Sequence, residues 1–429
     1  SEMCIRDSAC TTGSHNTALG YGAMSATTTA GWCTAVGRDA LAVHTTGADN
    51  TAVGYACMSK LTTGTNNVAM GNSALANLTT TAGNTAIGKA SLTASVTGSY
   101  NTALGYLALT ACLDGGNNIA VGHNALAANT AGASNTAVGT SALAANTTAN
   151  ENTAVGKSAL AANTTAADNV AVGSNAMAAT TTGANNVAVG KNALASNTTG
   201  DRNVAIGRYA MDVSTTAQYN IAIGNDALGS CTTGSSNVSI GTNVCAAITT
   251  GANNVAIGTN ALDAAATSSN NTAVGYNAMS ANTGGSENAS FGRNSMLSNT
   301  TGADNAAFGN GALYSNTTAS YNTAFGSQAL LSNTTGTQNV AVGFAALDAV
   351  TTSSYNTAVG YNALTANTAA DNTAVGRAAL SNNTTGTDNT AVGKGSLAQN
   401  TTASYNTAVG TEALGLNTTG AENTAVGYD

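Results

Sequence analysis

Proline is absent from the 429 residues of this chain, and only 7% of the residues are charged. The absence of proline favours continuous β ladders, because each proline would remove one backbone donor. Disordered chains combine low hydrophobicity with high charge, whereas hydrophobic residues make up 43% here. Collagen is excluded because the sequence has no Gly-X-Y period. No run of 18 apolar residues is present, so we expect no membrane-spanning segment.

The residues that usually carry enzyme chemistry are scarce and scattered. Three histidines occupy unrelated positions, so no metal cluster is expected. The cysteines form no Cys-x-x-Cys motif, and we expect those within the repeats to be unpaired, packed thiols. Neither a phosphate-binding glycine loop nor a Ser-His-Asp arrangement stands out. The sequence therefore predicts a protein that is not an enzyme, with no catalytic residue, metal or cofactor. Its net charge of −8 argues against nucleic acid as a partner.

What the chain does contain is one motif, Asn-Thr-Ala-Val-Gly and its variants, repeated 25 times. We number its glycine position 0. These glycines lie 17 residues apart from Gly20 to Gly427, except for one 16-residue step between Gly360 and Gly376. Helical repeats are usually longer, at roughly 33 to 47 residues. Alternation over positions −4 to 0 predicts a short strand, and a second extended stretch is expected at +3 and +4. The Asn-Thr-Thr-Gly segment that follows is typical of a turn.

The repeat predicts an all-β fold, a parallel β-solenoid (β-roll) of about 25 coils, over one continuous domain at residues 11–429. Coils that stack at about 4.8 Å would make a rod of roughly 120 Å. Positions −1 and +4 are almost always apolar and are expected to form a core ladder; examples are Val155, Leu160, Val172, Met177, Val189 and Leu194. Asparagine at −4 is expected to form a structural amide ladder; examples are Asn152, Asn169, Asn186 and Asn203.

Two variable positions indicate solvent-facing stripes along the coils. Position +1 carries eight of the eleven basic residues, position −5 carries eight acidic residues, and both carry tyrosines. One interpretation is a solvated face that keeps the protein in solution. The other is lateral contact between copies, with the basic stripe of one on the acidic stripe of the next; its candidates are Lys157, Lys191, Arg208, Tyr276, Tyr361, Asp168 and Asp304.

The Thr-rich segment at +7 to +9 allows two functional hypotheses beside a plain turn. Ordered threonine columns suit ice binding, but adjacent threonines on a regular strand point to opposite sides. The same segment forms Asn-Thr-Thr sequons at an expected exposed turn, which predicts possible glycosylation sites in a secreted protein. These are Asn146, Asn163, Asn197, Asn299, Asn316, Asn333, Asn383, Asn400 and Asn417.

The two ends depart from the repeat. Residues 1–10 break the pattern and are expected to be a non-repeat leader, possibly artefactual, and the chain stops two residues past Gly427. We therefore expect a piece of a longer repeat protein. An open coil end is an unpaired β edge, which favours end-to-end stacking of copies.

The motifs at 152–156 and 203–207 resemble the head repeats of trimeric autotransporter adhesins, the YadA-like heads, and repeats of some phage tail fibres. The resemblance implies a left-handed β-roll, three chains side by side, and adhesion at a cell surface. It also implies that Val204 and Ile206 face the coil interior and that Ala205 lies toward a neighbouring chain. The family period is about 14 residues, against 17 here.

The function expected is therefore that of an extracellular or cell-surface structural repeat protein, as a fibre, a filament or the rod-like head of an adhesin. Its main partner would be itself, through end-to-end or lateral homo-oligomers, with a trimer as one arrangement. A host surface or glycan would be a further partner. The alternatives are an ice-binding or glycan-binding solenoid and a segment of a phage tail fibre.

Overall fold

The computed structural model describes residues 11–429, so the leader expected at 1–10 lies outside the described residues. Its regular elements are 25 three-residue strands, each at positions −3 to −1 of one repeat. The chain forms two compact units, one ending at Ala217 and one beginning at Gln218. Each unit is a parallel β-solenoid, as the repeat predicts.

The strands follow one another once per coil. The first unit contains β1 (Thr17–Leu19), β2 (Thr34–Val36), β3 (Thr51–Val53), β4 (Val68–Met70), β5 (Thr85–Ile87), β6 (Thr102–Leu104), β7 (Ile119–Val121), β8 (Thr136–Val138), β9 (Thr153–Val155), β10 (Val170–Val172), β11 (Val187–Val189) and β12 (Val204–Ile206). The second unit contains β13 (Ile221–Ile223), β14 (Val238–Ile240), β15 (Val255–Ile257), β16 (Thr272–Val274), β17 (Ala289–Phe291), β18 (Ala306–Phe308), β19 (Thr323–Phe325), β20 (Val340–Val342), β21 (Thr357–Val359), β22 (Thr373–Val375), β23 (Thr390–Val392), β24 (Thr407–Val409) and β25 (Thr424–Val426).

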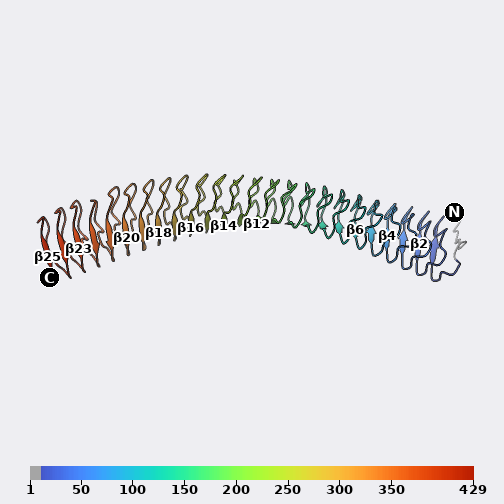
Figure 1. The fold of residues 1–429 in the computed structure, drawn as a ribbon, viewed down its shortest axis with the longest axis horizontal. Coiled ribbons are helices and arrows are strands. Elements are labelled where there is room, and N and C mark those ends of the chain that lie inside the picture. Colours follow the sequence, from blue (N-terminus) through green and yellow to red (C-terminus); the bar gives the residue numbers. More distant parts are fainter. Residues whose placement is uncertain (1–10) are drawn as a thin grey trace. The chain divides into compact units, whose positions relative to one another are not determined.

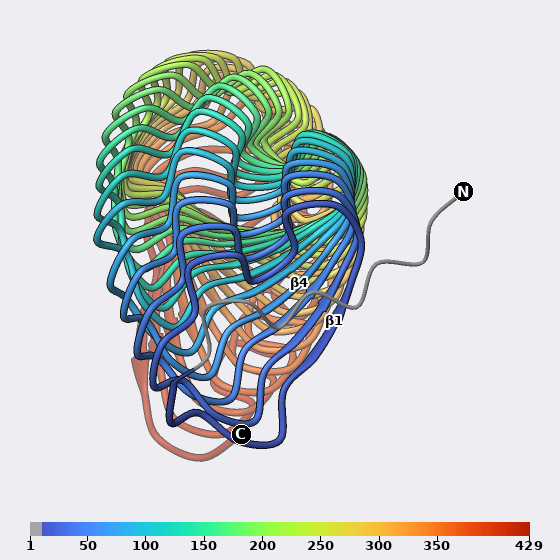
Figure 2. The ribbon, with the colours of Figure 1, turned by 90° about the vertical axis from the view of Figure 1, so that its right-hand side faces the viewer.

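Within each unit, successive strands pair in parallel and in register (Figure 1). Ala171, for example, lies opposite Ala188. The end-on view shows successive coils repeating the same path (Figure 2). The 16-residue coil keeps this register, because Thr357 still pairs with Thr373. The missing residue is therefore absorbed in the turns, and the strand columns continue through this coil.

Within each unit, backbone hydrogen bonds join successive coils. Gly156 donates its N–H to the carbonyl of Val138 in the preceding coil, at 2.8 Å. Thr153 donates to Asn169 in the following coil, also at 2.8 Å. Coil-to-coil bonds of this kind recur along both units, so each coil depends on its neighbours for its hydrogen bonds.

The segment at +1 to +6 is a series of turns, so the second extended stretch expected at +3 and +4 is wrong. Positions +2 and +4 have left-handed backbones, with φ of 55° at Ser158 and 50° at Leu160. A positive φ is uncommon for leucine, as for most residues other than glycine. The composition of the repeat gives no indication of this conformation. Its amide still bonds to the next coil, since Leu160 donates to Ala176 at 3.0 Å.

The glycine at position 0 is required by both backbone and space. Gly156 has φ of +136°, and a Cβ at this position would lie 2.5 Å from the carbonyl oxygen of Gly173 in the next coil. Real side chains do not approach a backbone this closely, and the positive φ adds strain for any residue other than glycine. The glycine column therefore lets successive coils approach at the spacing of a β ladder.

The interior is lined by small and amide side chains together with one larger apolar column. Leu160, Met177 and Leu194 at +4 are fully buried, which confirms that half of the predicted core ladder. The other half is wrong, because the −1 residues lie on the outside with 36% of their surface exposed; they are Val155, Val172 and Val189.

The reason for this error is the alternation of side chains along a strand. Positions −2 and −1 point to opposite faces, so only one of them can be inside. Alanine at −2 is fully buried and leaves room for the coil to close tightly. The orientation implied by the adhesin-head resemblance is reversed in the same way: Ala205 is buried, Ile206 is 38% exposed and Val204 is partly exposed.

Candidate functional site

The asparagine at −4 forms the ladder that the repeat predicts. Asn152, Asn169 and Asn186 are buried, and each side-chain Oδ1 accepts the backbone N–H of the next asparagine at about 2.9 to 3.0 Å. The Nδ2 of Asn169 donates to the carbonyl of Gly183 at 3.0 Å, and Asn203 continues the ladder by donating its N–H to Asn186. The column is thus a structural device that satisfies buried polar groups in each coil.

A second buried column lies at +7 and contains the asparagines predicted as glycosylation sites. Asn146 and Asn163 are fully buried, and Nδ2 of Asn163 donates to Oδ1 of Asn146 at 3.0 Å and to the carbonyl of Ala166 at 3.0 Å. Asn417, in the last coil of the chain, is partly exposed but keeps the same bonds.

The prediction of an exposed glycosylation turn is therefore wrong for the folded coil, since a glycan on Nδ2 would occupy the packed interior. This applies to the fully buried sequon asparagines Asn146, Asn163, Asn197, Asn299, Asn316, Asn333, Asn383 and Asn400.

The two threonines that follow have different surroundings, as their adjacency predicts. Thr164 at +8 is partly buried, and its Oγ1 donates to the carbonyl of Thr181 in the next coil at 3.2 Å. Thr165 at +9 is exposed. The hydroxyls at +8 are thus engaged by the backbone, which leaves +9 as the outward threonine column of this corner.

The outer face of the sheet is the feature that sequence reasoning missed. Positions −3 and −1 lie on it in every coil, with threonine, valine or isoleucine at most −3 positions and an apolar residue at −1. In the second unit, Phe291, Phe308 and Phe325 at −1 stack on one another, with ring centroids 4.7 and 4.9 Å apart. The sequence does indicate this face by a run of phenylalanines at position −1. We expected position −1 to lie in the interior, and the face was therefore missed.

The variable positions flank this outer face. All seven candidate contact residues are exposed: Lys157, Lys191, Arg208, Tyr276 and Tyr361 at +1, and Asp168 and Asp304 at −5. Within the +1 stripe, aromatic and basic side chains of successive coils pair with one another. The guanidinium of Arg38 lies 5.7 Å from the ring centroid of Tyr21 and 5.9 Å from that of Tyr55. The ring of Tyr361 stacks on Phe344 at 5.5 Å.

Five cysteines of the described chain are buried and unpaired, as expected for packed thiols: Cys33, Cys57, Cys112, Cys231 and Cys245. Burial raises the pKa of the Cys57 and Cys245 thiols to about 12 and that of Cys112 and Cys231 to about 11. Thiols of this kind are poor nucleophiles and poor metal ligands at neutral pH. Cys4 and Cys10 lie outside the described residues.

His44 occupies the same interior column as the +7 asparagines. It is fully buried, and its Nε2 lies 3.4 Å from Nδ2 of Asn50 in the −4 ladder. Burial lowers the pKa of this imidazole, so it is neutral in the folded chain at pH 7. In this coil, His44 takes the place of the asparagine found at +7 in other coils.

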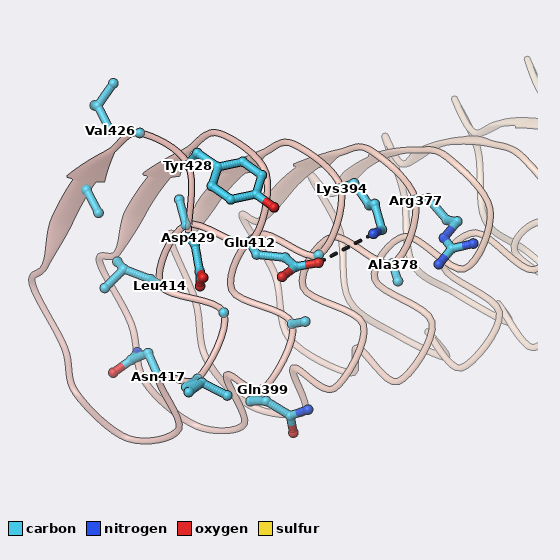
Figure 3. A pocket seen from close by; sticks show the side chains of 17 residues that line it. Arg377, Ala378, Lys394, Gln399, Glu412, Leu414, Asn417, Val426, Tyr428 and Asp429 are labelled. Atoms are coloured by element: carbon cyan, nitrogen blue, oxygen red, sulfur yellow. Dashed lines mark hydrogen bonds and ion pairs between the residues drawn. The ribbon is translucent and has the colours of Figure 1, made fainter.

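A hollow lies beside the last coils of the second unit (Figure 3). Its lining includes Arg377, Tyr428 and a half-exposed ion pair between Lys394 Nζ and Glu412 Oε1 at 3.4 Å. None of its lining residues is His, Cys or Ser.

Two further findings concern metals and membranes. Within residues 11–429, no three His, Cys, Asp or Glu side chains are close enough to share a metal ion. The same part of the chain has no helix of the length and apolarity that a bilayer crossing needs.

No protein-family model matches the chain, and no curated protein matches it in sequence. The features of the molecule that bear on its function are therefore the coil itself, its outer face and the two stripes beside that face.

Proposed function

We propose that this chain is a non-enzymatic structural repeat segment of an extracellular fibre or of a rod-like surface adhesin, and that it works by associating with further copies of itself. The observation that carries the proposal is the outer sheet face. Ile206 at 38% exposed and Val172 at 36% represent an apolar column that continues from coil to coil. Contiguous apolar surface of this kind marks interaction sites in soluble proteins. The extracellular placement follows from the resemblance to adhesin heads, which also implies three chains.

The free energy that the outer face contributes to association depends on the number of coils that are covered. Burying a whole valine side chain stabilises by about 1.5 to 3 kcal/mol, so covering the exposed third of each −1 valine contributes roughly 0.5 to 1 kcal/mol. A dozen coils then contribute about 6 to 12 kcal/mol, whereas association costs about 4 to 15 kcal/mol in lost freedom. A few coils would not hold two chains together, and a long array can. This dependence accounts for a protein built from many near-identical repeats.

Sedimentation velocity and electron microscopy of the purified protein test the proposal. The first variant replaces three outer-face valines with lysine, namely Val155→Lys, Val172→Lys and Val189→Lys. The matched control replaces the three exposed +9 threonines of the same coils, namely Thr165→Lys, Thr182→Lys and Thr199→Lys. We expect oligomers in the parent protein and the control, and a shift to monomers in the outer-face variant. A parent protein that is monomeric at all concentrations would overturn the proposal.

Ice binding is the second candidate, and one observation favours it. The last five strands, β21 to β25, all read Thr-Ala-Val, so five successive coils place a threonine at −3 beside a valine at −1 on the outer face. Repeated hydroxyl and methyl groups at the ladder spacing of about 4.8 Å are suited to ordering surface water. Thermal hysteresis and ice-crystal shaping by the parent protein measure this directly. Crystals that grow unshaped at high protein concentration would exclude it.

A further inference from the structure

The interior of one coil in the first unit holds a side chain whose charge can change near neutral pH. His44 lies at +7, in the column that contains Asn146 and Asn163 further along the chain, and it is fully buried. Thr27 occupies the same column one coil earlier, and Leu61 occupies it one coil later. The ordinary pKa of histidine is about 6.5, so acidification protonates an imidazole that water can reach. The interior must therefore either accommodate the cation or expel it.

The −4 asparagine ladder determines which group faces the ring. Oδ1 of Asn50 accepts the backbone N–H of Asn67 at 3.1 Å, so the next coil sets the orientation of the Asn50 amide. Its Nδ2 donates to the carbonyls of Gly64 at 2.8 Å and Ala48 at 3.1 Å, and it lies 3.4 Å from Nε2 of His44. Because an amide nitrogen is a donor, Nε2 faces it with a lone pair, and the neutral ring carries its proton on Nδ1. A second proton, on Nε2, would place a donor against a donor.

The other ring nitrogen has no partner to stabilise a cation. Nδ1 of His44 is buried, and no atom of residues 11–429 accepts a hydrogen bond from it. An imidazolium in this place would have one N–H unpaired and the other opposed to the amide of Asn50. A buried charge without paired hydrogen bonds is strongly disfavoured. Burial accordingly lowers the pKa of this imidazole.

The titratable neighbours of His44 do not offset such a charge. In residues 20–71, which contain its coil and the two adjoining coils, the buried titratable groups besides His44 are the thiols of Cys33 and Cys57. Burial raises the pKa of both thiols, so they are neutral at pH 5 to 7. The remaining titratable side chains of this segment are exposed or half-exposed at the surface: Tyr21, Arg38, Asp39, Asp49, Tyr55 and Lys60.

We infer that His44 is an acid-sensitive switch: on protonation its imidazolium leaves the interior, and the coil between β2 and β3 opens. The next residue, Thr45, joins three coils, because its N–H donates to Thr62 at 2.9 Å and its carbonyl accepts the N–H of Thr28 at 3.1 Å. Outward movement of His44 breaks these bonds and frees amides in adjoining coils. The switch acts through the interior and is independent of the proposed self-association.

The direction of the pH effect follows from where the proton binds more tightly. The open coil exposes His44 to water and binds a proton with the ordinary pKa of about 6.5, whereas the closed coil resists protonation. The contribution of the closed coil to stability is therefore complete above pH 6.5 and is lost as the pH falls below that value. The segment around β2 and β3 thus stays closed in neutral surroundings and loosens in mildly acidic ones.

Hydrogen exchange of the full chain at pH 7.5 and pH 5.0, corrected for the intrinsic effect of pH on exchange, tests the switch. The variant is His44→Asn, which introduces the asparagine found at +7 in other coils. Protonation of the open coil favours opening by up to about 30-fold at pH 5.0. We expect peptides that contain the amide of Thr45 to exchange at least fivefold faster at pH 5.0 in the parent, and less than twofold faster in His44→Asn.

Two further variants complete the comparison. His123 is exposed at +1 and stacks on Tyr106 with ring centroids 5.5 Å apart, so His123→Asn is the matched control and should keep the full acceleration at Thr45. His44→Leu introduces the residue that Leu61 supplies in the next coil, and it serves as the second variant if His44→Asn does not fold. A parent protein without the acceleration, or equal acceleration in the parent and the His44 variants, would overturn the inference.

The protonation state of the ring supplies the second measurement. Nitrogen-15 chemical shifts of labelled histidine distinguish the two neutral tautomers from the cation. We expect the neutral Nδ1–H form for His44 in the closed coil, and a cation only in the coil that has opened. A coil that stays closed at pH 5.0 with a cationic His44 would overturn the inference, whatever the exchange rates.

Discussion

Substitution of the position-0 glycine is the most direct test of the coil geometry. Gly309 has φ of +142°, and a Cβ there would lie 2.5 Å from both the carbonyl carbon and the oxygen of Gly326 in the next coil. Holding alanine in this backbone region costs about 1 to 3 kcal/mol, and overpacking against a neighbouring backbone costs about 1 to 3 kcal/mol more. We therefore expect Gly309→Ala to destabilise its coil by roughly 2 to 6 kcal/mol.

The same coil contains a matched control. Gly311 at +2 has φ of +65°, and the nearest atom to a Cβ there is Leu331 Cδ1 at 3.4 Å, an ordinary contact. Other coils hold alanine at this position in the same conformation, as at Ala345 with φ of 49°. Both variants change the unfolded chain equally, since each replaces glycine with alanine. The difference between them isolates the contact between coils.

Hydrogen exchange measured by mass spectrometry is the suitable assay, because a long repeat array does not unfold in two states. A difference of about 3 kcal/mol corresponds to exchange more than 100-fold faster. We expect this acceleration in Gly309→Ala for peptides that contain the amide of Gly326, which donates to Phe308 at 2.7 Å. Equal exchange in the two alanine variants would refute the close approach of glycine columns.

Three further predictions follow from the interior. Asn169→Ala leaves the buried N–H of Asn186 and the carbonyl of Gly183 without their partner, so we expect a loss of about 2 to 5 kcal/mol, seen as faster exchange in both adjoining coils; an unchanged exchange rate would contradict the ladder. Burial raises the pKa of Cys57 from 9.0 to about 12, so its contribution to stability is complete below pH 9 and falls by about 1.4 kcal/mol per pH unit up to about pH 12. Cys57→Ala should therefore show a smaller loss of stability between pH 8 and pH 10.5 than the parent, in urea titrations at both pH values; equal losses would rule out this origin. Finally, intact mass after secretion from a glycosylating host should show no glycan on Asn163 in folded protein, and a folded, glycosylated Asn163 would contradict its buried position.

The period of the fold and its two main ladders were predictable from the sequence. A strictly repeated glycine and a nearly invariant asparagine at −4 leave little choice of register, and the structure confirms both the strands and the Asn169 ladder. The buried column at +4 was also predictable, since a leucine or methionine recurs there among small residues. In each case one residue type was demanded by a geometric or hydrogen-bonding requirement.

The inside and outside of the strand were not predictable in the same way. Alternation shows which residues share a face, but it does not show which face is inside. Valine is larger and more apolar than alanine, so Val155 was assigned to the core, yet the tightly closed coil accommodates only Ala154 there. The prediction of exposed sequons was wrong for a related reason. Asn-Thr-Thr is typical of an exposed turn, but its asparagine points inward in this fold. The left-handed Leu160 had no sequence signal at all.

The coil-to-coil hydrogen bonds also determine how the chain would respond to mechanical force. Each coil is bonded only to its two neighbours, as in the bond from Gly156 to Val138. A pull applied to the two ends of a stack therefore loads one set of bonds at a time, and the outermost coil detaches before the next is strained. Each detached coil of 17 residues would lengthen the chain by roughly 50 to 55 Å, the extended length minus one ladder spacing. The molecule would then yield in equal steps and dissipate work at each one, as a tether does that must stretch without breaking.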